Sequence, residues 1–179
     1  SHHDEEWYEQ NNVEFRAGVT VTEVDTESRQ VSLSSGDSVA YEKLLIATGA
    51  DVIQLNVPGA DLEGIHYLRA IPDSDALIAA CKDSERAVAV GGGFIGLELA
   101  SSFRQLELDV TLVYMEDRLW PTTLTPDLSE WLANHYRDQG MRLLPESQVA
   151  AFRGDGRVGS VALASGAELA TDFVALGVG

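Results

Sequence analysis

Three glycines at a fixed spacing are the residues of this 179-residue sequence that most directly suggest chemistry. Residues 86–100 read RAVAVGGGFIGLELA, so an apolar run ends at Gly91, and Gly93 and Gly96 complete a G-x-G-x-x-G pattern. Gly91 would make a tight turn, Gly93 would let the backbone approach a phosphate, and Gly96 would let a helix pack closely on the strand. Since the first N–H groups of a helix attract anions, the segment predicts a dinucleotide-binding loop, against the alternative of a purely structural turn.

An acidic residue follows at the distance that this kind of site requires. A second apolar run, residues 110–115, ends at Glu116, twenty residues after Gly96. A carboxylate there would accept hydrogen bonds from the hydroxyls of an adenosine ribose.

The elements after the loop complete an α/β unit. Thr125, Pro126 and Asp127 predict a helix start, and the helix should end at Gly140, with Leu128, Trp131, Leu132 and His135 on its buried face. On that face His135 is expected to be a packed residue and not a ligand. Residues 141–144 predict a strand, residues 148–153, 159–164 and 167–171 a β-meander, and residues 173–176 a buried strand that runs into Gly177.

The elements before the loop are shorter. Residues 4–12 are expected to be the last turns of a helix without a cap of its own, and residues 13–15, 19–24, 30–33 and 39–42 should form a β-meander. Residues 43–49 (KLLIATG) predict a strand buried on both faces, and residues 50–64 a linker. A short strand over 65–68 and a helix capped by Asp73 or Ser74 and running to Lys82 precede the glycine loop.

The sequence also repeats itself. At an offset of 130, residues 31–49 match residues 161–179, with Ser35-Gly36 on Ser165-Gly166; just upstream an offset of 128 places Tyr8 on Tyr136. This predicts one architectural unit used twice, with only its last part present in the first copy. We therefore expect a piece of a longer protein with two nucleotide-binding domains, while the alternative is chance reuse of a meander.

Composition limits the classes of partner and location. The net charge of −17, from 12 basic and 29 acidic residues, would repel a phosphate backbone, so nucleic acid is not an expected partner. No apolar run reaches the roughly 20 residues of a membrane span and no signal-peptide pattern opens the chain, which favours a cytoplasmic protein without membrane contact. Cys81 stands alone and is expected to be a small hydrophobic residue, no metal site is expected, and residues 1–3 (SHH) resemble a cloning remnant or a disordered end.

Two motifs together resemble a known superfamily. The LLIATG run of residues 44–49 and the VGGGFIGLEL run of residues 90–99 are similar to the flavin-dependent pyridine-nucleotide oxidoreductases, in which an ATG turn closes an FAD domain and a GGGxIGLE segment opens an NAD(P)H domain. Residues 110–116, 65–69 and 6–8 are most similar to monodehydroascorbate reductases. Ferredoxin reductases and apoptosis-inducing-factor-like flavoproteins share most of these features.

The resemblance implies a fold and domain bounds. The fold is α/β, a Rossmann-like βαβ sheet with an inserted three-stranded β-meander, plus a partial FAD-domain β-meander at the N-terminus. Residues 1–50 would end a truncated FAD-binding domain, residues 51–85 would link, and residues 86–179 would form the NAD(H)-binding domain.

It also implies roles for single residues. Phe94 and Ile95 would flank the nicotinamide and the pyrophosphate, and Gly177 and Gly179 would let the last strand approach the nicotinamide ribose. Glu98 would lie near the nicotinamide and the flavin, or serve only as an acid that the helix dipole favours. Tyr114 would stack on adenine or simply pack. The FAD-side residues would be Ala47, Thr48 and Gly49.

The implied activity is hydride transfer from NADH to FAD, followed by electron transfer to an ascorbate radical, a ferredoxin or a similar acceptor. NADH is favoured over NADPH because Glu116 and Asp117 oppose a 2′-phosphate, although Arg118 lies close in the sequence. Since the flavin pyrophosphate loop would precede Trp7, we expect the chain alone to bind NAD(H) weakly and to catalyse nothing. The alternative is a nucleotide-sensing flavoprotein of apoptosis-inducing-factor type. The oligomeric state is not predicted.

Overall fold

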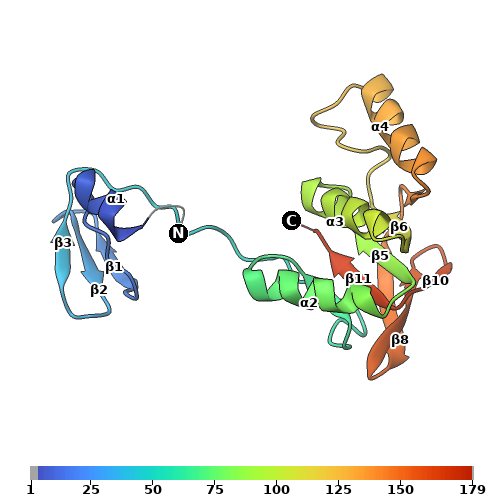
Figure 1. Ribbon diagram of the computed structural model, residues 1–179, viewed down its shortest axis with the longest axis horizontal. Helices are drawn as coiled ribbons and strands as arrows, with labels where there is room; N and C mark the ends of the chain where they lie inside the picture. The colour runs from blue at the N-terminus through green and yellow to red at the C-terminus, as the bar shows by residue number, and fades with distance from the viewer. Residues whose placement is uncertain (1–3, 179) are drawn as a thin grey trace. The chain divides into compact units, whose positions relative to one another are not determined.

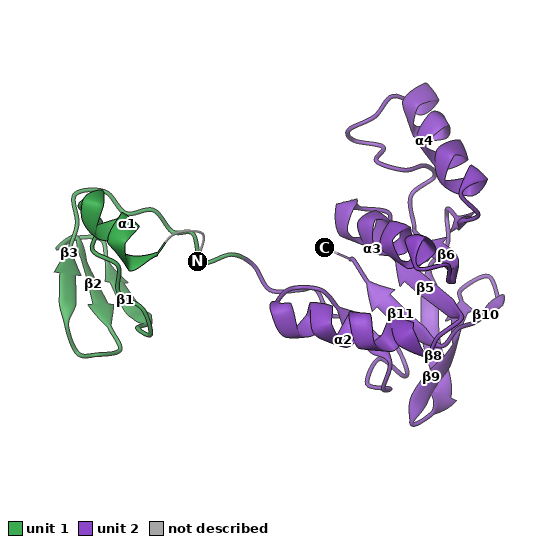
Figure 2. Cartoon of the chain, viewed as in Figure 1, with its two compact units in different colours: residues 1–49 green, residues 50–179 purple. Residues whose placement is uncertain are grey.

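The computed structural model describes residues 4–178 and divides the chain into two compact units, residues 1–49 and 50–179 (Figure 2). Each unit is described by itself. Gly179, expected beside the nicotinamide ribose, and residues 1–3 lie outside the described residues. No helix among residues 4–178 combines the length and the apolar character needed to cross a membrane.

The second unit is built on a five-stranded parallel sheet (Figure 1). In sheet order the strands are β4 (Ile65–Tyr67), β11 (Phe173–Leu176), β5 (Arg86–Val90), β6 (Asp109–Val113) and β7 (Arg142–Leu144). The last strand of the chain therefore enters the sheet between β4 and β5. The segment that the sequence set apart as residues 51–85 contributes β4 to this sheet.

Two layers cover the sheet. On one face Ala87 and Ala89 of β5 join the apolar side chains of α2 (Ile71–Lys82), α3 (Phe94–Gln105) and α4 (Pro126–Asp138). On the other face Val88 and Val90 join the antiparallel meander of β8 (Val149–Asp155), β9 (Arg157–Leu163) and β10 (Glu168–Ala170). Both faces of β5 are buried, as parallel strands require. The Rossmann-like sheet with an inserted meander is thus confirmed.

The helices differ from expectation in two places. α2 begins at Ile71, earlier than predicted, and Asp73 caps it from its first turn by accepting bonds from the N–H groups of Arg69 (2.8 Å) and Ala70 (2.7 Å). These bonds lower the pKa of Asp73, the one from Ala70 most.

The predicted buried face of α4 is wrong at three of its four positions; the fourth, Leu132, is half-buried and packs against the core. Leu128 and Trp131 are 52% and 65% exposed, and His135 is exposed and stacked on Trp131 at 5.9 Å, so it is not a packed core residue. The buried positions are the small Ser129 and Ala133. The Ser129 hydroxyl donates to the carbonyl of Leu119 at 2.6 Å, which holds the helix close to the preceding loop and turns the larger side chains outward.

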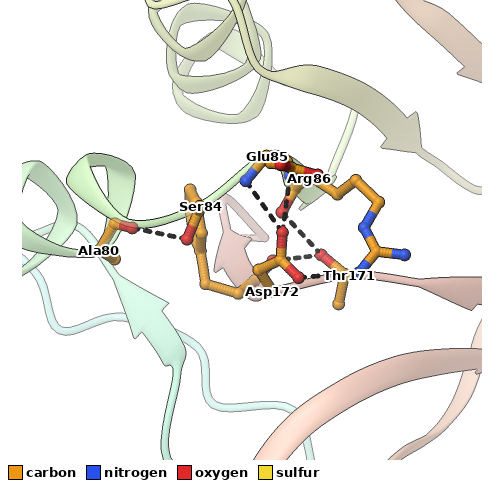
Figure 3. A network of polar contacts seen from close by, with 7 residues as sticks. Ala80, Ser84, Glu85, Arg86, Thr171 and Asp172 are labelled. Carbon is orange, nitrogen blue, oxygen red and sulfur yellow. Dashed lines mark hydrogen bonds and ion pairs between the residues drawn. The ribbon is translucent and has the colours of Figure 1, made fainter.

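A polar cluster joins β5 and β11 at the amino edge of the sheet (Figure 3). The Asp172 carboxylate accepts bonds from the N–H groups of Glu85 (3.0 Å) and Arg86 (2.8 Å) and from the Arg86 guanidinium (2.9 Å). Burial raises the pKa of this carboxyl, but the hydrogen bonds outweigh it and hold the pKa below the ordinary value. The buried Thr171 hydroxyl donates to the carbonyl of Phe173 at 2.6 Å.

Residues 4–49, the described part of the first unit, hold one short helix and one meander. These are α1 (Glu5–Gln10), β1 (Val21–Asp25), β2 (Gln30–Leu33) and β3 (Ser38–Ala40), in the order β1-β2-β3. The predicted absence of a cap is wrong, since the Asp4 carboxylate accepts a bond from the N–H of Trp7 at 3.0 Å. Residues 13–15 form no strand; Val13 instead donates to the carbonyl of Tyr8 at 2.8 Å and closes the end of the helix.

Residues 43–49 also differ from the prediction of a strand buried on both faces. They form no regular element, and Leu45 and Ile46 are 87% and 69% exposed. Among residues 4–178 no strand pairs with this segment. A parallel strand needs neighbours for its backbone groups, so an apolar run without them stays irregular.

Candidate dinucleotide-binding site

The glycine loop lies where β5 ends and α3 begins. Gly91 adopts φ +111°, a backbone conformation that other residues rarely adopt, and its N–H donates to the carbonyl of Val113 at 2.8 Å. A Cβ at Gly91 would lie 2.4 Å from the carbonyl oxygen of Gly177. The tight turn therefore also brings the end of β5 against the end of β11.

Gly96 lies closer to neighbouring backbone than the other glycines of this loop do. A Cβ on it would lie 1.9 Å from the carbonyl oxygen of Gly91, and a Cβ on Gly177 would lie 2.5 Å from the backbone nitrogen of Gly96. Gly91, Gly96 and Gly177 thus form a three-way backbone contact among β5, α3 and β11. This contact sets the start of α3 directly above the carboxyl ends of two strands.

Gly93 differs from these three glycines. It is the N-cap of α3, and a Cβ on it would meet no atom within 4 Å. The first bond of the helix runs from the N–H of Leu97 to the carbonyl of Gly93, so the N–H groups of the first turn have no partner within the helix. Unpaired N–H groups beside open space are the arrangement that a phosphate fits.

The open space belongs to a cleft with a volume of about 600 Å³. Its walls come from the carboxyl ends of β11, β5, β6 and β7 and from a loop that precedes β4. The lining residues are Ile53, Leu55, Asn56, Val57, Val90, Gly91, Gly92, Gly93, Val113, Tyr114, Met115, Glu116, Ser147, Gln148, Val149, Gly177 and Val178. A cleft across the carboxyl edge of a parallel sheet is the usual ligand position in this class of fold.

Of the charged residues after β6, an acidic one lines the cleft and the basic one does not. Glu116 is exposed and lines the cleft. The Arg118 guanidinium donates to the carbonyl of Pro121 at 3.0 Å and forms an ion pair with Asp117 at 3.4 Å. Arg118 is not among the residues that line the cleft. The charged group that faces the cleft at this end is therefore a carboxylate.

Tyr114 lies in the core. It is only 3% exposed, and its ring lies beside the position that a Cβ on Gly92 would take, at 3.0 Å. Burial raises the pKa of its hydroxyl, and the charges of Glu116 and Asp117 add to that rise against the opposing charge of Arg137. Tyr114 also lines the cleft, together with Gly92 and Glu116.

Other residues expected at the site lie elsewhere on α3 or in the first unit. Phe94 and Ile95 are 58% and 46% exposed, and Glu98 is exposed one turn further on, so the three share one solvent-facing side of the helix. The Phe94 ring packs against the Trp120 ring, with the two ring centroids 4.4 Å apart. Ala47, Thr48 and Gly49 belong to the irregular end of the first unit.

Sequence reasoning missed two parts of the cleft. The first, residues 53–57, lies in the predicted linker and shows no periodicity that could identify it. The second, residues 147–149, follows β7. The rule that carboxyl ends of parallel strands meet at one edge could have found it, because residues 141–144 were predicted as a strand.

Comparison with known proteins identifies the family. A family model described as pyridine nucleotide-disulphide oxidoreductase matches residues 3–179. The chain belongs to this family. Its characterised relatives are oxidoreductases that use NAD(P)H and FAD, and the resemblance noted in the sequence is confirmed.

Individual relatives cover nearly all of the chain. It is 36% identical over 176 residues to the ferredoxin–NAD(+) reductase component of the biphenyl dioxygenase system of Paraburkholderia xenovorans, covering 98% of this chain and 43% of that protein. It is 35% identical over 181 residues to the seedling monodehydroascorbate reductase of Cucumis sativus, covering 97% and 42%. It is also 35% identical over 176 residues to a nitrite reductase [NAD(P)H] of Bacillus subtilis, covering 98% and 22%. The chain thus spans less than half the length of these relatives.

Solved structures of related oxidoreductases have the same fold as this chain. A ferredoxin reductase from Rhodopseudomonas palustris matches with a TM-score of 0.89 and 31% identity over 99% of this chain and 44% of that one. A water-forming NADH oxidase from Lactobacillus brevis, solved with NADH bound, matches with a TM-score of 0.75 and 25% identity over 90% and 37%.

Proposed function

We propose that the second unit binds NADH across the carboxyl edge of its sheet and that the whole protein passes electrons from NADH, through FAD, to an acceptor. The observation that carries the proposal is the open space at Gly93, which adjoins the unpaired N–H groups of the first turn of α3. The residues present fit a dinucleotide, because the cleft continues from this point toward both β11 and β7.

The strand order suggests how the dinucleotide lies. A pyrophosphate over Gly93 would be held at the end of β5. Glu116, after β6, would then accept hydrogen bonds from the adenosine ribose on one side. Gly177, after β11, lines the cleft and would lie beside the nicotinamide ribose on the other side.

Preference for NADH over NADPH follows from the charges at the adenosine end. A 2′-phosphate would meet the Glu116 carboxylate, and the nearby Arg118 is engaged by the carbonyl of Pro121 and by Asp117. Two like charges at close range repel, and no cation lines this part of the cleft as described. We therefore infer that the ribose hydroxyls of NADH are preferred.

The role in the whole protein rests on the family. FAD would supply the group that accepts a hydride and releases single electrons. In the first unit the segment of Ala47, Thr48 and Gly49 is irregular and exposed, so by itself it forms no flavin cradle. Related proteins are named for ferredoxin and for monodehydroascorbate, and we propose an acceptor of one of these two kinds. We expect the 179-residue chain alone to be inactive.

Titration with NADH tests the site. Gly93→Val places a branched side chain where the pyrophosphate would lie, so NADH affinity should fall by more than tenfold, whereas Gly159→Val in β9, outside the cleft, should leave it unchanged. Equal affinities of the wild type and Gly93→Val would refute the assignment.

Comparison of NADH with NADPH tests the preference. The wild type should bind NADH more tightly than NADPH. Glu116→Ala should lower the affinity for NADH by about tenfold, since a hydrogen bond to a charged group is lost, and should raise the affinity for NADPH. Tighter binding of NADPH to the wild type would contradict the proposal. Assay of the longer protein with ferredoxin and ascorbate-radical acceptors tests turnover; tight NADH binding without turnover would favour a sensing function.

A further inference from the structure

The wall of the cleft that precedes β4 contains one polar side chain. Residues 53–57 contribute Ile53, Leu55, Asn56 and Val57 to the lining, and Asn56 is exposed. An amide side chain both donates and accepts hydrogen bonds, so it can recognise a carboxamide or a ribose hydroxyl, which charged residues at the same place would match less well.

The chain on each side of Asn56 is fixed. The N–H of Leu55 donates to the Tyr67 hydroxyl at 2.9 Å. The carbonyl of Val57 accepts a bond from the N–H of Ala60 at 3.2 Å, and the side chains of Leu55 and Val57 pack against the apolar cluster on the meander face of the sheet. Between residues 51 and 56, the bond to Tyr67 is the only hydrogen bond recorded among the described residues.

Tyr67 places this wall at one end of the cleft. It is the last residue of β4 and pairs with Leu176, the residue before Gly177. Leu55, Tyr67 and Val178 also pack against the same apolar cluster. Glu116, in contrast, follows β6, and β11 and β5 stand between β4 and β6 in the sheet. The wall therefore lies on the β11 side, away from the acid.

We propose that Asn56 is a binding residue for the nicotinamide half of NADH and that Tyr67 is the residue that positions it. The inference rests on the proposed function, since Gly177 marks the nicotinamide end only if the dinucleotide lies as argued above. The Asn56 amide would pair with the carboxamide or the adjoining ribose. The Tyr67 hydroxyl would act through the Leu55 N–H, which keeps Asn56 directed at the ligand and reduces the ordering cost of binding.

Binding of NADH and of AMP to the 179-residue chain separates the two halves of the ligand. Asn56→Ala should lower the affinity for NADH by about fivefold, which is the equivalent of one neutral hydrogen bond. Its affinity for AMP should stay within about twofold of the wild-type value. Tyr67→Phe should have a similar effect on NADH and should speed amide hydrogen exchange at residues 53–57. In the double variant the two losses should be less than additive, because both changes disrupt one contact.

Matched controls define what would overturn the inference. Gln54→Ala removes an exposed amide two residues away that does not line the cleft, and Tyr41→Phe removes a hydroxyl that donates to the Asp25 carbonyl at 3.3 Å in the first unit; neither should change NADH affinity. Unchanged NADH affinity in Asn56→Ala would overturn the binding role. Equal weakening of NADH and AMP would also overturn it, by showing a general defect.

The remaining outcomes distinguish the two claims. If Asn56→Ala weakens NADH but Tyr67→Phe changes neither affinity nor exchange, the positioning role is wrong. If the wild type binds neither NADH nor AMP, the proposed function itself fails, and the inference fails with it.

Discussion

Replacement of Gly96 by alanine should destabilise the second unit through a single methyl group. The added Cβ would lie 1.9 Å from the carbonyl oxygen of Gly91, whereas ordinary contact begins at 3.4 Å, so α3 or the glycine loop must move by about 1.5 Å. Alanine would otherwise favour the helix by roughly 1 kcal/mol. Overpacking in a closely packed site costs about 1–3 kcal/mol and occasionally more, and here the obstacle is backbone, which yields less than a side chain. We therefore expect a net loss of about 2 kcal/mol.

Thermal unfolding followed by circular dichroism measures this loss. At this chain length a loss of 2 kcal/mol corresponds to a decrease of roughly 4–8 °C in Tm. Gly159→Ala is the matched control, because its Cβ would find its nearest neighbour, the carbonyl oxygen of Arg153, at 3.9 Å, and its Tm should change by no more than about 2 °C. A Gly96→Ala variant that melts with the wild type would refute the reasoning, because the three-glycine contact would then be no barrier to a side chain.

Two further predictions concern the sheet edge and α4. Asp172→Asn should lower stability at pH 7 by about 1–2 kcal/mol in denaturant unfolding, because the charged acceptor of the Glu85 and Arg86 N–H groups and the ion pair with Arg86 are lost. Since the folded-state pKa of Asp172 is lowered, its contribution is present above the unfolded pKa of about 4 and is lost as the pH falls through the folded value, so wild type and variant should converge in acid; a constant gap would contradict this. Trp131→Ser should change stability by less than about 0.5 kcal/mol, whereas Phe103→Ala, at 2% exposure, should cost about 3–5 kcal/mol; a large loss for Trp131→Ser would restore the buried face predicted from the sequence.

The sheet of the second unit could be predicted from the sequence because its signals are local and agree with one another. The β5 run is apolar on both faces and is followed at once by Gly91, and the meander strands are separated by turn residues such as Gly166, which adopts φ +88°. In these segments residue type, periodicity and chain connectivity specify the same structure.

The face of α4 could not be predicted because periodicity identifies an apolar stripe but not what covers it. The stripe that contains Trp131 has the spacing of a buried face. The Ser129 hydroxyl and the small Ala133 allow a closer approach to the core than Trp131 would, and this decides the orientation of the helix. The cleft wall at Asn56 was missed for a related reason. Its position depends on a hydrogen bond between Leu55 and Tyr67, twelve residues apart, which leaves no pattern in the sequence.

The internal repeat is present in the hydrogen bonds of both units. Leu33 donates to the carbonyl of Asp37 at 2.9 Å, and Leu163, 130 residues later, donates to that of Ala167 at 2.8 Å. The register repeats as well, since Ser32 faces Ser38 in the first meander and, at the same offset, residue 162 faces residue 168 in the second. Near α1, the bond from Val13 to Tyr8 recurs 128 residues later at the end of α4.

Comparison of the two copies of the repeat shows what residues 43–49 lack in order to form a strand. At the same offset, residues 44–46 correspond to residues 174–176 of β11, which are buried and paired on both sides by β4 and β5. The two segments have similar apolar sequences, yet Leu45 is 87% exposed whereas Ala175 is fully buried. Their composition therefore does not decide the outcome; the flanking strands do. The segment that ends at Gly49 has the sequence of a central parallel strand, and we propose that two further strands would pair with it and bury Leu45 if the chain is part of a longer protein, as the length of its relatives suggests.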